Sequence, residues 1–195
     1  MTRLAAVAPI LLVLASPAVA EDVVEPKSGI KFDARSGDLS LLGVGVRTRT
    51  FLKVKVYAIG LYVADSALAG PLAAHKGKTS TPAFFNELVS GDFPKELRMK
   101  FVREVTASQI QDAFRESLAG ANGARVDQFV GYFPDTKVGQ EYILQWSPGG
   151  TLDVTAAGLK KVPIADKAFA QRVFGIWLGP KPIQDEIKQG LVSRW

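Results

Sequence analysis

The stretch Gly43–Asp65, GVGVRTRTFLKVKVYAIGLYVAD, decides the fold of this chain. Its second half, Val56–Val63, is almost wholly apolar, whereas cations recur through the part that precedes it. This pattern predicts two antiparallel strands that are joined by a turn centred near Leu52. Residues at equal distances from the turn face each other and share one face of the sheet. The turn therefore places Arg47 opposite Tyr57.

The same pairing places Arg49 opposite Lys55, and it brings one guanidinium and one phenol together. The guanidinium of Arg47 offers a planar fork of donors, and the phenol of Tyr57 adds an O–H donor. Facing an apolar cleft, these groups suit a carboxylate or phenolate ligand. Two alternatives stay open. Arg47 is solvated or paired with an acid such as Asp38, and Tyr57 is a core aromatic residue with a satisfied hydroxyl.

Motifs for cofactors, metals and catalysis are missing from the sequence. The chain has no cysteine and a single histidine, His75, and it carries no GxSxG, P-loop or GxGxxG pattern. Gly43 and Gly45 resemble a phosphate loop only in part, because no helix follows them. They indicate strand twist or the close approach of another backbone segment. We expect no cofactor and no metal ion.

Outward from this hairpin, strands and helices follow without regular alternation. Thr106 and Gln109 form a capping box that predicts a helix ending at Gly120, with Ile110 and Ser117 on one face. Further along, the sequence indicates a hairpin turning at 147–150, a helix that begins at Asp166 and ends at 178–180, and a last helix after Pro182. The order predicts an α+β fold, an antiparallel sheet with helices packed on it.

The first twenty residues, MTRLAAVAPILLVLASPAVA, read as a cleaved export signal. An early arginine precedes an apolar run, and Ala-Val-Ala fits the small-residue cleavage pattern. The run is short for a membrane span, although an uncleaved anchor is the alternative. We expect residues 21–195 to form one domain without a transmembrane segment, located in a bacterial periplasm.

The charge balance argues against a nucleic-acid partner. The formal net charge is +5 at pH 7, and acidic residues are interleaved with the basic ones, as in KELRMKFVRE. Nucleic-acid-binding proteins usually concentrate their cations in one patch or stripe. An anionic small ligand or a membrane surface remains compatible with this mild basic balance.

Several stretches resemble the chalcone isomerase-like family. The resemblance begins in GVGVRTRTFLKVKVYAIGLYVAD and continues through FPKELRMKFVREVTASQIQDAFRESL, YILQWSPGGTLDVTAAG and KAFAQRVFGIWLGPKPIQDEIKQGLV. It covers essentially all of residues 21–195 in the same order. It implies an open-faced β-sandwich, in which a long antiparallel sheet carries a layer of helices on one face and a ligand cleft lies between them.

The resemblance also implies which residues line that cleft. The plant isomerases of the family use an arginine and a threonine on the paired strands, a tyrosine and an asparagine on one helix, and a polar residue on a later helix. Matched position by position, this sequence keeps the arginine as Arg47. It has Tyr57, Ile110, Ser117 and Ile176 at the other four positions. The two isoleucines cannot donate hydrogen bonds to a developing enolate.

The five residues resemble the fatty-acid-binding branch of the family, in which an arginine and a tyrosine hold a carboxylate. We therefore expect a non-catalytic periplasmic protein that binds a fatty acid or a similar amphiphilic carboxylate, most simply a long-chain one. The alternatives are an intramolecular lyase or isomerase of the chalcone isomerase type, and an interaction protein with a vestigial cleft. The sequence does not indicate the oligomeric state.

Overall fold

The structure, a computed structural model, describes residues 22–50 and 52–195, so the expected export signal at residues 1–20 lies outside the described residues. In the described part, the main sheet has eight strands in the order β10-β8-β7-β6-β5-β4-β3, with β9 beside β8, and the neighbouring strands are antiparallel. The strand bounds are β1 Val23–Val24, β2 Lys31–Phe32, β3 Arg35–Ser36, β4 Leu39–Arg49, β5 Val54–Ala64, β6 Lys95–Phe101, β7 Glu141–Ser147, β8 Thr151–Ala156, β9 Leu159–Lys160 and β10 Ile164–Ala165.

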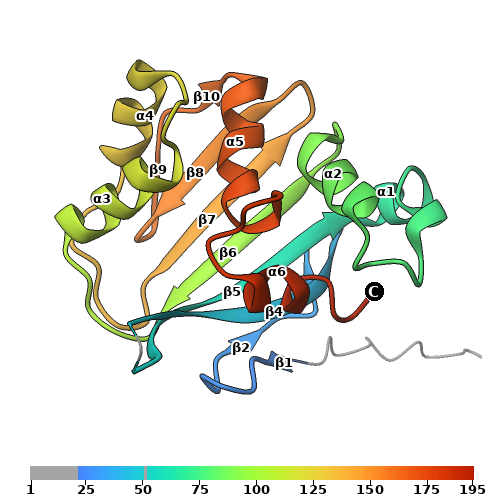
Figure 1. Cartoon of the computed structure of the whole chain (residues 1–195), viewed down its shortest axis with the longest axis horizontal. Coiled ribbons are helices and arrows are strands. Elements are labelled where there is room, and N and C mark those ends of the chain that lie inside the picture. The colour runs from blue at the N-terminus through green and yellow to red at the C-terminus, as the bar shows by residue number, and fades with distance from the viewer. Residues whose placement is uncertain (1–21, 51) are drawn as a thin grey trace, which may run out of the picture.

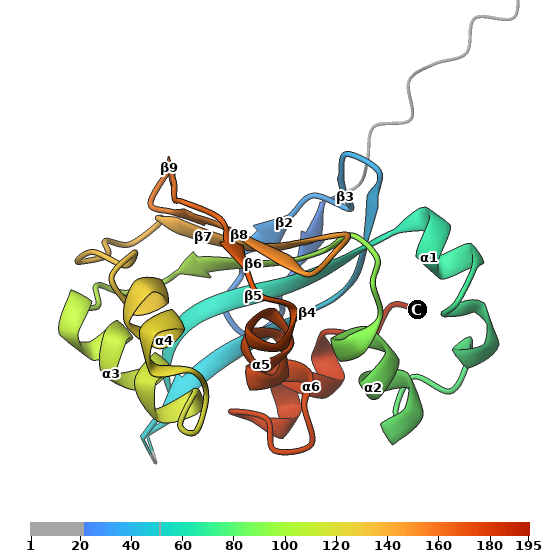
Figure 2. The same cartoon turned by 90° about the horizontal axis from the view of Figure 1, so that it is seen from above.

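The helices lie together on one face of this sheet, while the small β1–β2 sheet lies on the other face (Figures 1 and 2). This arrangement confirms the predicted open-faced β-sandwich. Among the described residues, every helix is too short or too polar to cross a bilayer. The helix bounds are α1 Asp65–Ala69, α2 Pro82–Ser90, α3 Ala107–Ser117, α4 Gly123–Val130, α5 Lys167–Leu178 and α6 Asp185–Gly190, with a short 3₁₀ turn at Ala73–His75.

The local sequence signals correctly predict where α3 and α5 begin, but not where α6 begins. Thr106 forms the predicted capping box with Gln109 at the start of α3. Asp166 accepts a hydrogen bond from the Phe169 N–H at the start of α5. The last helix, expected directly after Pro182, begins only at Asp185, because a bend at Ile183 and an extended Gln184 precede it.

The β4–β5 register confirms one predicted pair and corrects the other. Arg47 lies opposite Tyr57 as expected. Arg49 instead lies opposite Val54, and Lys55 lies opposite Thr48, because a register shift follows the Arg47–Tyr57 pair on the side of the turn. A bulge of this kind adds one residue to one strand, so each pair closer to the turn is displaced by one position.

The glycines of GVGVR allow α6 to lie directly on β4. A Cβ atom added at Gly43 would overlap the carbonyl oxygen of Gly190, and one added at Gly45 would lie 3.2 Å from the Ile187 Cα. This confirms the expected close backbone approach. The contact brings the beginning of α6 to the part of β4 that carries Arg47.

A buried lysine fastens the connection between α2 and β6. Lys95 is 1% exposed, and its ammonium group donates a hydrogen bond of 2.7 Å to the Gly91 carbonyl. The rings of Phe93, Trp146 and Phe174 surround it, with centroids 4.7, 4.2 and 5.5 Å from Nζ. Burial lowers the pKa of Lys95 to about 7, while the surrounding rings favour the charged form.

Candidate functional site

A cleft of about 810 Å³ lies between the β4–β5 hairpin, strand β6 and helices α3 and α5. Its volume falls within the range of roughly 300–1,000 Å³ that is typical of small-molecule sites. The five residues singled out from the sequence all line it, although they come from distant parts of the chain: Arg47, Tyr57, Ile110, Ser117 and Ile176. The predicted proximity of these residues is thus observed, while their role in binding stays a prediction.

Arg47 is fixed in the cleft through one of its terminal nitrogens. Its Nη1 donates to the Thr48 carbonyl at 2.9 Å, to Gln184 Oε1 at 3.2 Å and to the Ile183 carbonyl at 3.4 Å. The same Gln184 oxygen accepts the Thr48 backbone N–H at 3.2 Å. The close packing of α6 on β4 therefore positions the guanidinium.

The other edge of this guanidinium is available to a ligand. Among the described residues, Arg47 forms no ion pair with a carboxylate, and its Nε and Nη2 make no hydrogen bond. Both nitrogens are reached by solvent, since no buried side-chain nitrogen or oxygen of the described residues lacks a partner. The alternative pairing with Asp38 is therefore not observed, and Arg47, which lines the cleft, keeps two parallel N–H donors without a described partner.

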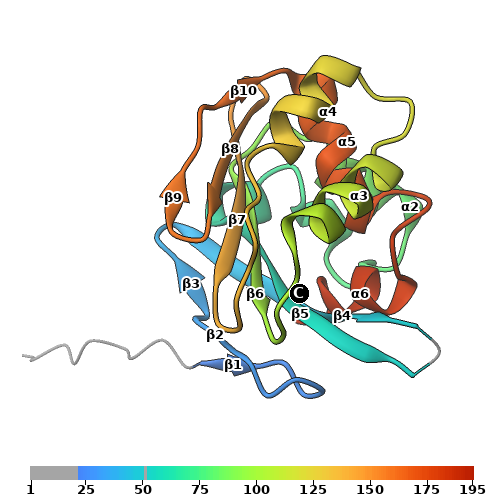
Figure 3. The same cartoon turned by 90° about the vertical axis from the view of Figure 1, so that its left-hand side faces the viewer.

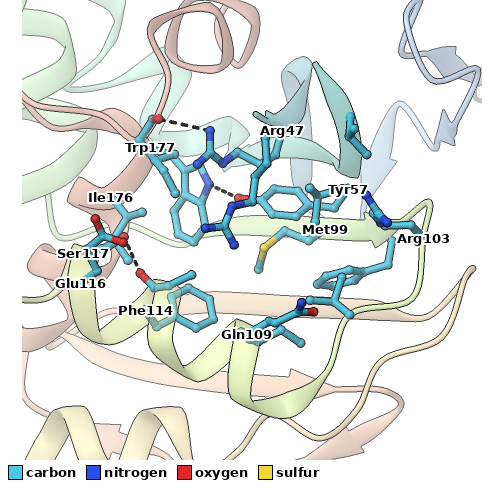
Figure 4. A pocket seen from close by; sticks show the side chains of 18 of the residues that line it. Arg47, Tyr57, Met99, Arg103, Gln109, Phe114, Glu116, Ser117, Ile176 and Trp177 are labelled. Atoms are coloured by element: carbon cyan, nitrogen blue, oxygen red, sulfur yellow. Dashed lines mark hydrogen bonds between the residues drawn. The ribbon is translucent and has the colours of Figure 1, made fainter. Parts of the chain in front are cut away.

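Tyr57 adds a neutral hydroxyl beside this guanidinium. Its oxygen accepts a hydrogen bond of 3.0 Å from the indole N–H of Trp177 on α5, as the close-up in Figure 4 shows. Burial raises the pKa of Tyr57 to about 12, against smaller opposing effects from Trp177 and Arg47. The phenol is therefore protonated at neutral pH. Because Trp177 occupies an acceptor position of the oxygen, the phenolic proton remains free to be donated.

Apolar side chains form the inner walls of the cleft. Met99 and Phe101 on β6 are 1% and 3% exposed, and Ile110, Phe114 and Ile176 on the helices are 7%, 9% and 5% exposed. These walls surround a space that suits a hydrocarbon chain, while the polar groups of β4 and β5 lie at its sheet side. The two isoleucines contribute surface and no hydrogen-bonding capacity.

The rim of the cleft is polar. Ser117 is exposed there, and its hydroxyl donates 2.8 Å to the Ala113 carbonyl of its own helix. Three exposed cations, Arg49, Arg103 and Lys181, also line the cleft. Ser117 therefore lies on the same wall as Ile110, as expected, but its hydroxyl proton is directed to the backbone.

Sequence reasoning missed two residues that shape this site. Gln184 holds Arg47, and Trp177 holds Tyr57. Trp177 carried a weak signal, since it lies beside Ile176 in the predicted helix; Gln184 carried none. Among the described residues, no group of three or more His, Cys, Asp or Glu side chains could hold a metal ion.

Comparisons with known proteins agree with this architecture. Residues 23–193 match the family model described as chalcone isomerase-like. A crystal structure of a fatty-acid binding protein from Arabidopsis thaliana superposes with a TM-score of 0.77 at 21% sequence identity, covering 88% of this chain and 96% of that one. At this level of identity the superposition shows a shared fold.

The similar sequences carry two different functional names. A chalcone–flavanone isomerase 1 of Chrysanthemum morifolium is 28% identical over 199 residues, covering 89% of this chain and 84% of that protein. Fatty-acid-binding protein 1 of Arabidopsis thaliana is 26% identical over 198 residues, covering 89% of this chain and 70% of that protein. Overall similarity does not separate these functions, so the residues of the cleft have to.

Proposed function

Because the chain belongs to the chalcone isomerase-like family, we propose that it binds a fatty acid or a similar amphiphilic carboxylate in this cleft and does not catalyse a reaction. The carboxylate accepts hydrogen bonds from Arg47 and Tyr57, and the hydrocarbon chain packs against the apolar walls. A similar protein named for fatty-acid binding supports this assignment.

The observation that carries the proposal is the state of Arg47. A half-buried guanidinium that lines the cleft keeps Nε and Nη2 without a described hydrogen-bond partner, beside a phenol whose proton has no described acceptor. A carboxylate has the planar shape and the charge to accept both N–H groups together. It also supplies an ion-pair partner for Arg47, which forms no salt bridge with a described carboxylate.

The walls favour an aliphatic ligand over a vestigial cleft. A space of about 810 Å³ bordered by buried apolar side chains is large enough for a drug-sized molecule. An interaction protein that has lost its ligand does not need a space of this size with apolar inner walls. The size of the cleft therefore argues for a resident ligand.

We further propose that the protein acts in the periplasm. The support is the leader-like sequence of residues 1–20, in which an apolar run ends in a small-residue cleavage pattern. N-terminal sequencing of the protein isolated from its native cells, together with fractionation, tests this location. A mature N-terminus near Glu21 in the periplasmic fraction is the expected result.

An isomerase is the second candidate, favoured by the relatives that carry that name. Arg47 and Tyr57 retain groups able to stabilise an oxyanion. Ile110 and Ile176 provide no donor at two positions where the resemblance implies polar groups in isomerases. We therefore assign binding to this cleft and not turnover.

Two measurements test the binding function. Mass spectrometry of lipids extracted from the purified protein should detect an acyl carboxylate, and the delipidated protein should bind dodecanoic acid in a calorimetric titration. A variant that tests the location of the site is Ile110→Trp, which fills the space proposed for the hydrocarbon chain of the ligand and should weaken binding of the acid. If the delipidated, folded protein binds no carboxylate of any chain length, the proposal is wrong.

A further inference from the structure

The β4–β5 hairpin presents an apolar side chain to solvent beside the cleft. Figure 3 shows the ends of β4 and β5 extending past the rest of the sheet. Leu52, in the connection between them, is 70% exposed. Within this turn the Lys53 N–H donates to the Thr50 carbonyl at 3.0 Å, and both residues adopt a left-handed conformation, with φ of 51° and 65°.

That backbone conformation is uncommon for residues other than glycine, and for a β-branched threonine it is a marked departure. Sparsely populated conformations of this kind concentrate at functional segments. Leu52 lies between these two residues and leaves most of its surface exposed to solvent. The turn therefore offers an apolar side chain that the described fold does not cover.

Cations lie on the same hairpin and along the cleft. Arg49, Lys53 and Lys55 on the hairpin are exposed, and the Lys55 ammonium donates a hydrogen bond to the Lys27 carbonyl. Arg103 and Lys181 are two more exposed cations, and both line the cleft. None of these five forms an ion pair with a described carboxylate.

Acidic groups lie in the same region and reduce the positive charge without cancelling it. Glu104 and Glu116 line the cleft, and Glu186 on α6 is near enough to Lys53 for its pKa to be lowered by that charge among others. Five cations thus stand against three carboxylates. A surface that carries an exposed apolar residue and a net positive charge matches the interface of a bilayer that contains anionic lipids.

The hairpin is continuous with the cleft. Arg49 at the end of β4, Thr50 in the turn and Val54 at the start of β5 also line the cleft. Leu52 does not line the cleft itself, but it lies two positions from both Thr50 and Val54. An amphiphile with a long hydrocarbon chain is held in membranes more than in water, so an opening beside a membrane-facing turn gives it a short path.

We propose that Arg49, Leu52, Lys53 and Lys55, which we call the hairpin tip, dock the protein on an anionic phospholipid bilayer and direct the opening of the cleft toward the lipid. Leu52 enters the head-group region, and the cations contact lipid phosphates. The docking role stands on the surface itself, whereas the transfer of a ligand rests on the proposed function.

The β8–β9 turn and the strand β9 that follows it supply a matched control. Leu159 on β9 is 64% exposed, and Lys160 and Lys161 follow it. In Figure 2 this turn lies on the side of the sheet opposite the helices, and it does not line the cleft. It therefore reproduces the composition of the hairpin tip without its position.

Co-sedimentation with vesicles tests the proposal. The vesicles contain either phosphatidylcholine alone or equal parts of phosphatidylcholine and phosphatidylserine. Each basic residue near an anionic surface contributes about 1 kcal/mol, so Lys53→Gln combined with Lys55→Gln should weaken binding to the anionic vesicles about 30-fold. Leu52→Ser should weaken it at least about fivefold, because part of the leucine side chain no longer leaves water. Lys160→Gln with Lys161→Gln, and Leu159→Ser, should leave it unchanged.

Hydrogen exchange gives a second measurement. It reports on each peptide separately, so vesicle contacts made by the apolar run of residues 1–20, which all variants share, are not mistaken for contacts of the hairpin tip. Anionic vesicles should slow exchange in peptides that contain the hairpin tip and leave the β8–β9 turn unaffected. Equal losses for the paired variants, or equal protection of both turns, would overturn the proposal. So would binding that is the same on neutral and anionic vesicles and insensitive to salt.

The two proposals fail separately. Dodecanoic acid added from solution should bind Leu52→Ser as it binds the unmodified protein, while transfer of the acid from anionic vesicles should slow. If no variant binds the acid but vesicle binding still depends on the hairpin tip, the proposed ligand is wrong and the docking surface stands. If the acid binds and the vesicles do not distinguish the variants, the reverse holds.

Discussion

Replacing Arg47 with glutamine separates the head group of a ligand from its hydrocarbon chain. In the structure, Nη1 is held by Thr48, Ile183 and Gln184, which leaves Nε and Nη2 for the ligand. Glutamine keeps a polar side chain of smaller size but removes the charge and the paired donors. We therefore expect Arg47→Gln to weaken a long-chain acid and to leave the matching alcohol nearly unaffected.

The magnitude follows from the contacts. Hydrogen bonds to a charged group contribute about 1.5–3 kcal/mol net, so their loss weakens acid binding by roughly 10- to 150-fold. Each buried methylene contributes about 0.8 kcal/mol, so about ten of them exceed the contribution of the anchor. The chain thus provides most of the affinity, and Arg47 determines orientation and the choice of head group.

Calorimetric titration of dodecanoic acid and of dodecanol against both proteins measures the difference. Arg172→Gln is the matched control, because Arg172 donates to the Ala119 carbonyl at 2.7 Å and does not line the cleft. Equal losses for acid and alcohol would mean that Arg47 shapes the cleft without reading a carboxylate. An unchanged affinity for both would refute the assignment of Arg47 as the anchor.

Four further outcomes are expected. Gly43→Ala should lower the free energy of urea unfolding by at least about 1–3 kcal/mol, because the added Cβ meets the backbone of α6. The control Gly123→Ala, where a Cβ meets open space, should not lower it. Similar values for the two variants would contradict the close approach of α6 to β4. Trp177→Phe removes the donor to the Tyr57 hydroxyl and should destabilise the fold by about 1–2 kcal/mol, measured by the same unfolding assay; a stability equal to that of the unmodified protein would count against this hydrogen bond. The pKa of Lys95 is about 7 in the folded state against a reference value of 10.5, so between these pH values the unfolded state binds more protons and the free energy of unfolding rises with pH. From pH 7 to 9 the rise should be about 2 kcal/mol. If the same rise persists in Lys95→Met, Lys95 is not its cause. Purified protein should not accelerate chalcone cyclisation above the buffer rate at neutral pH, and turnover that disappears in Arg47→Ala would reverse the ranking of the two functions.

The sequence was most informative where interactions are local. The Arg47–Tyr57 pair was predicted correctly, but a bulge contributes to it. The pairs next to the turn, such as Arg49–Val54, would by themselves continue to Val56 opposite Arg47, and the extra residue in β5 moves Tyr57 there. Arg49 therefore lies opposite Val54 and not opposite Lys55. A bulge depends on how a strand packs against its neighbours, and no residue type in this hairpin predicts its position.

Long-range positions were beyond prediction. Gln184 reaches Arg47 because α6 settles on Gly43, and this contact depends on how the whole helical layer packs. The glycines indicated that some backbone would approach β4, without indicating which segment. Ile110 and Ile176 were placed in the cleft through the family resemblance, since their own patterns fit any buried helix face.

The support of Arg47 by α6 has a consequence for the order in which the binding site is assembled. Gln184 lies 137 positions after Arg47 in the chain, so the two meet through one of the most distant contacts of the fold. Contacts of this sequence separation require the intervening chain to be ordered before they are favourable. During synthesis the strands and the wall formed by β6 and α3 can therefore assemble while the guanidinium still lacks Ile183 and Gln184. The nascent protein would expose an apolar cleft before it can recognise a head group, and selectivity between head groups would be the last property that it acquires.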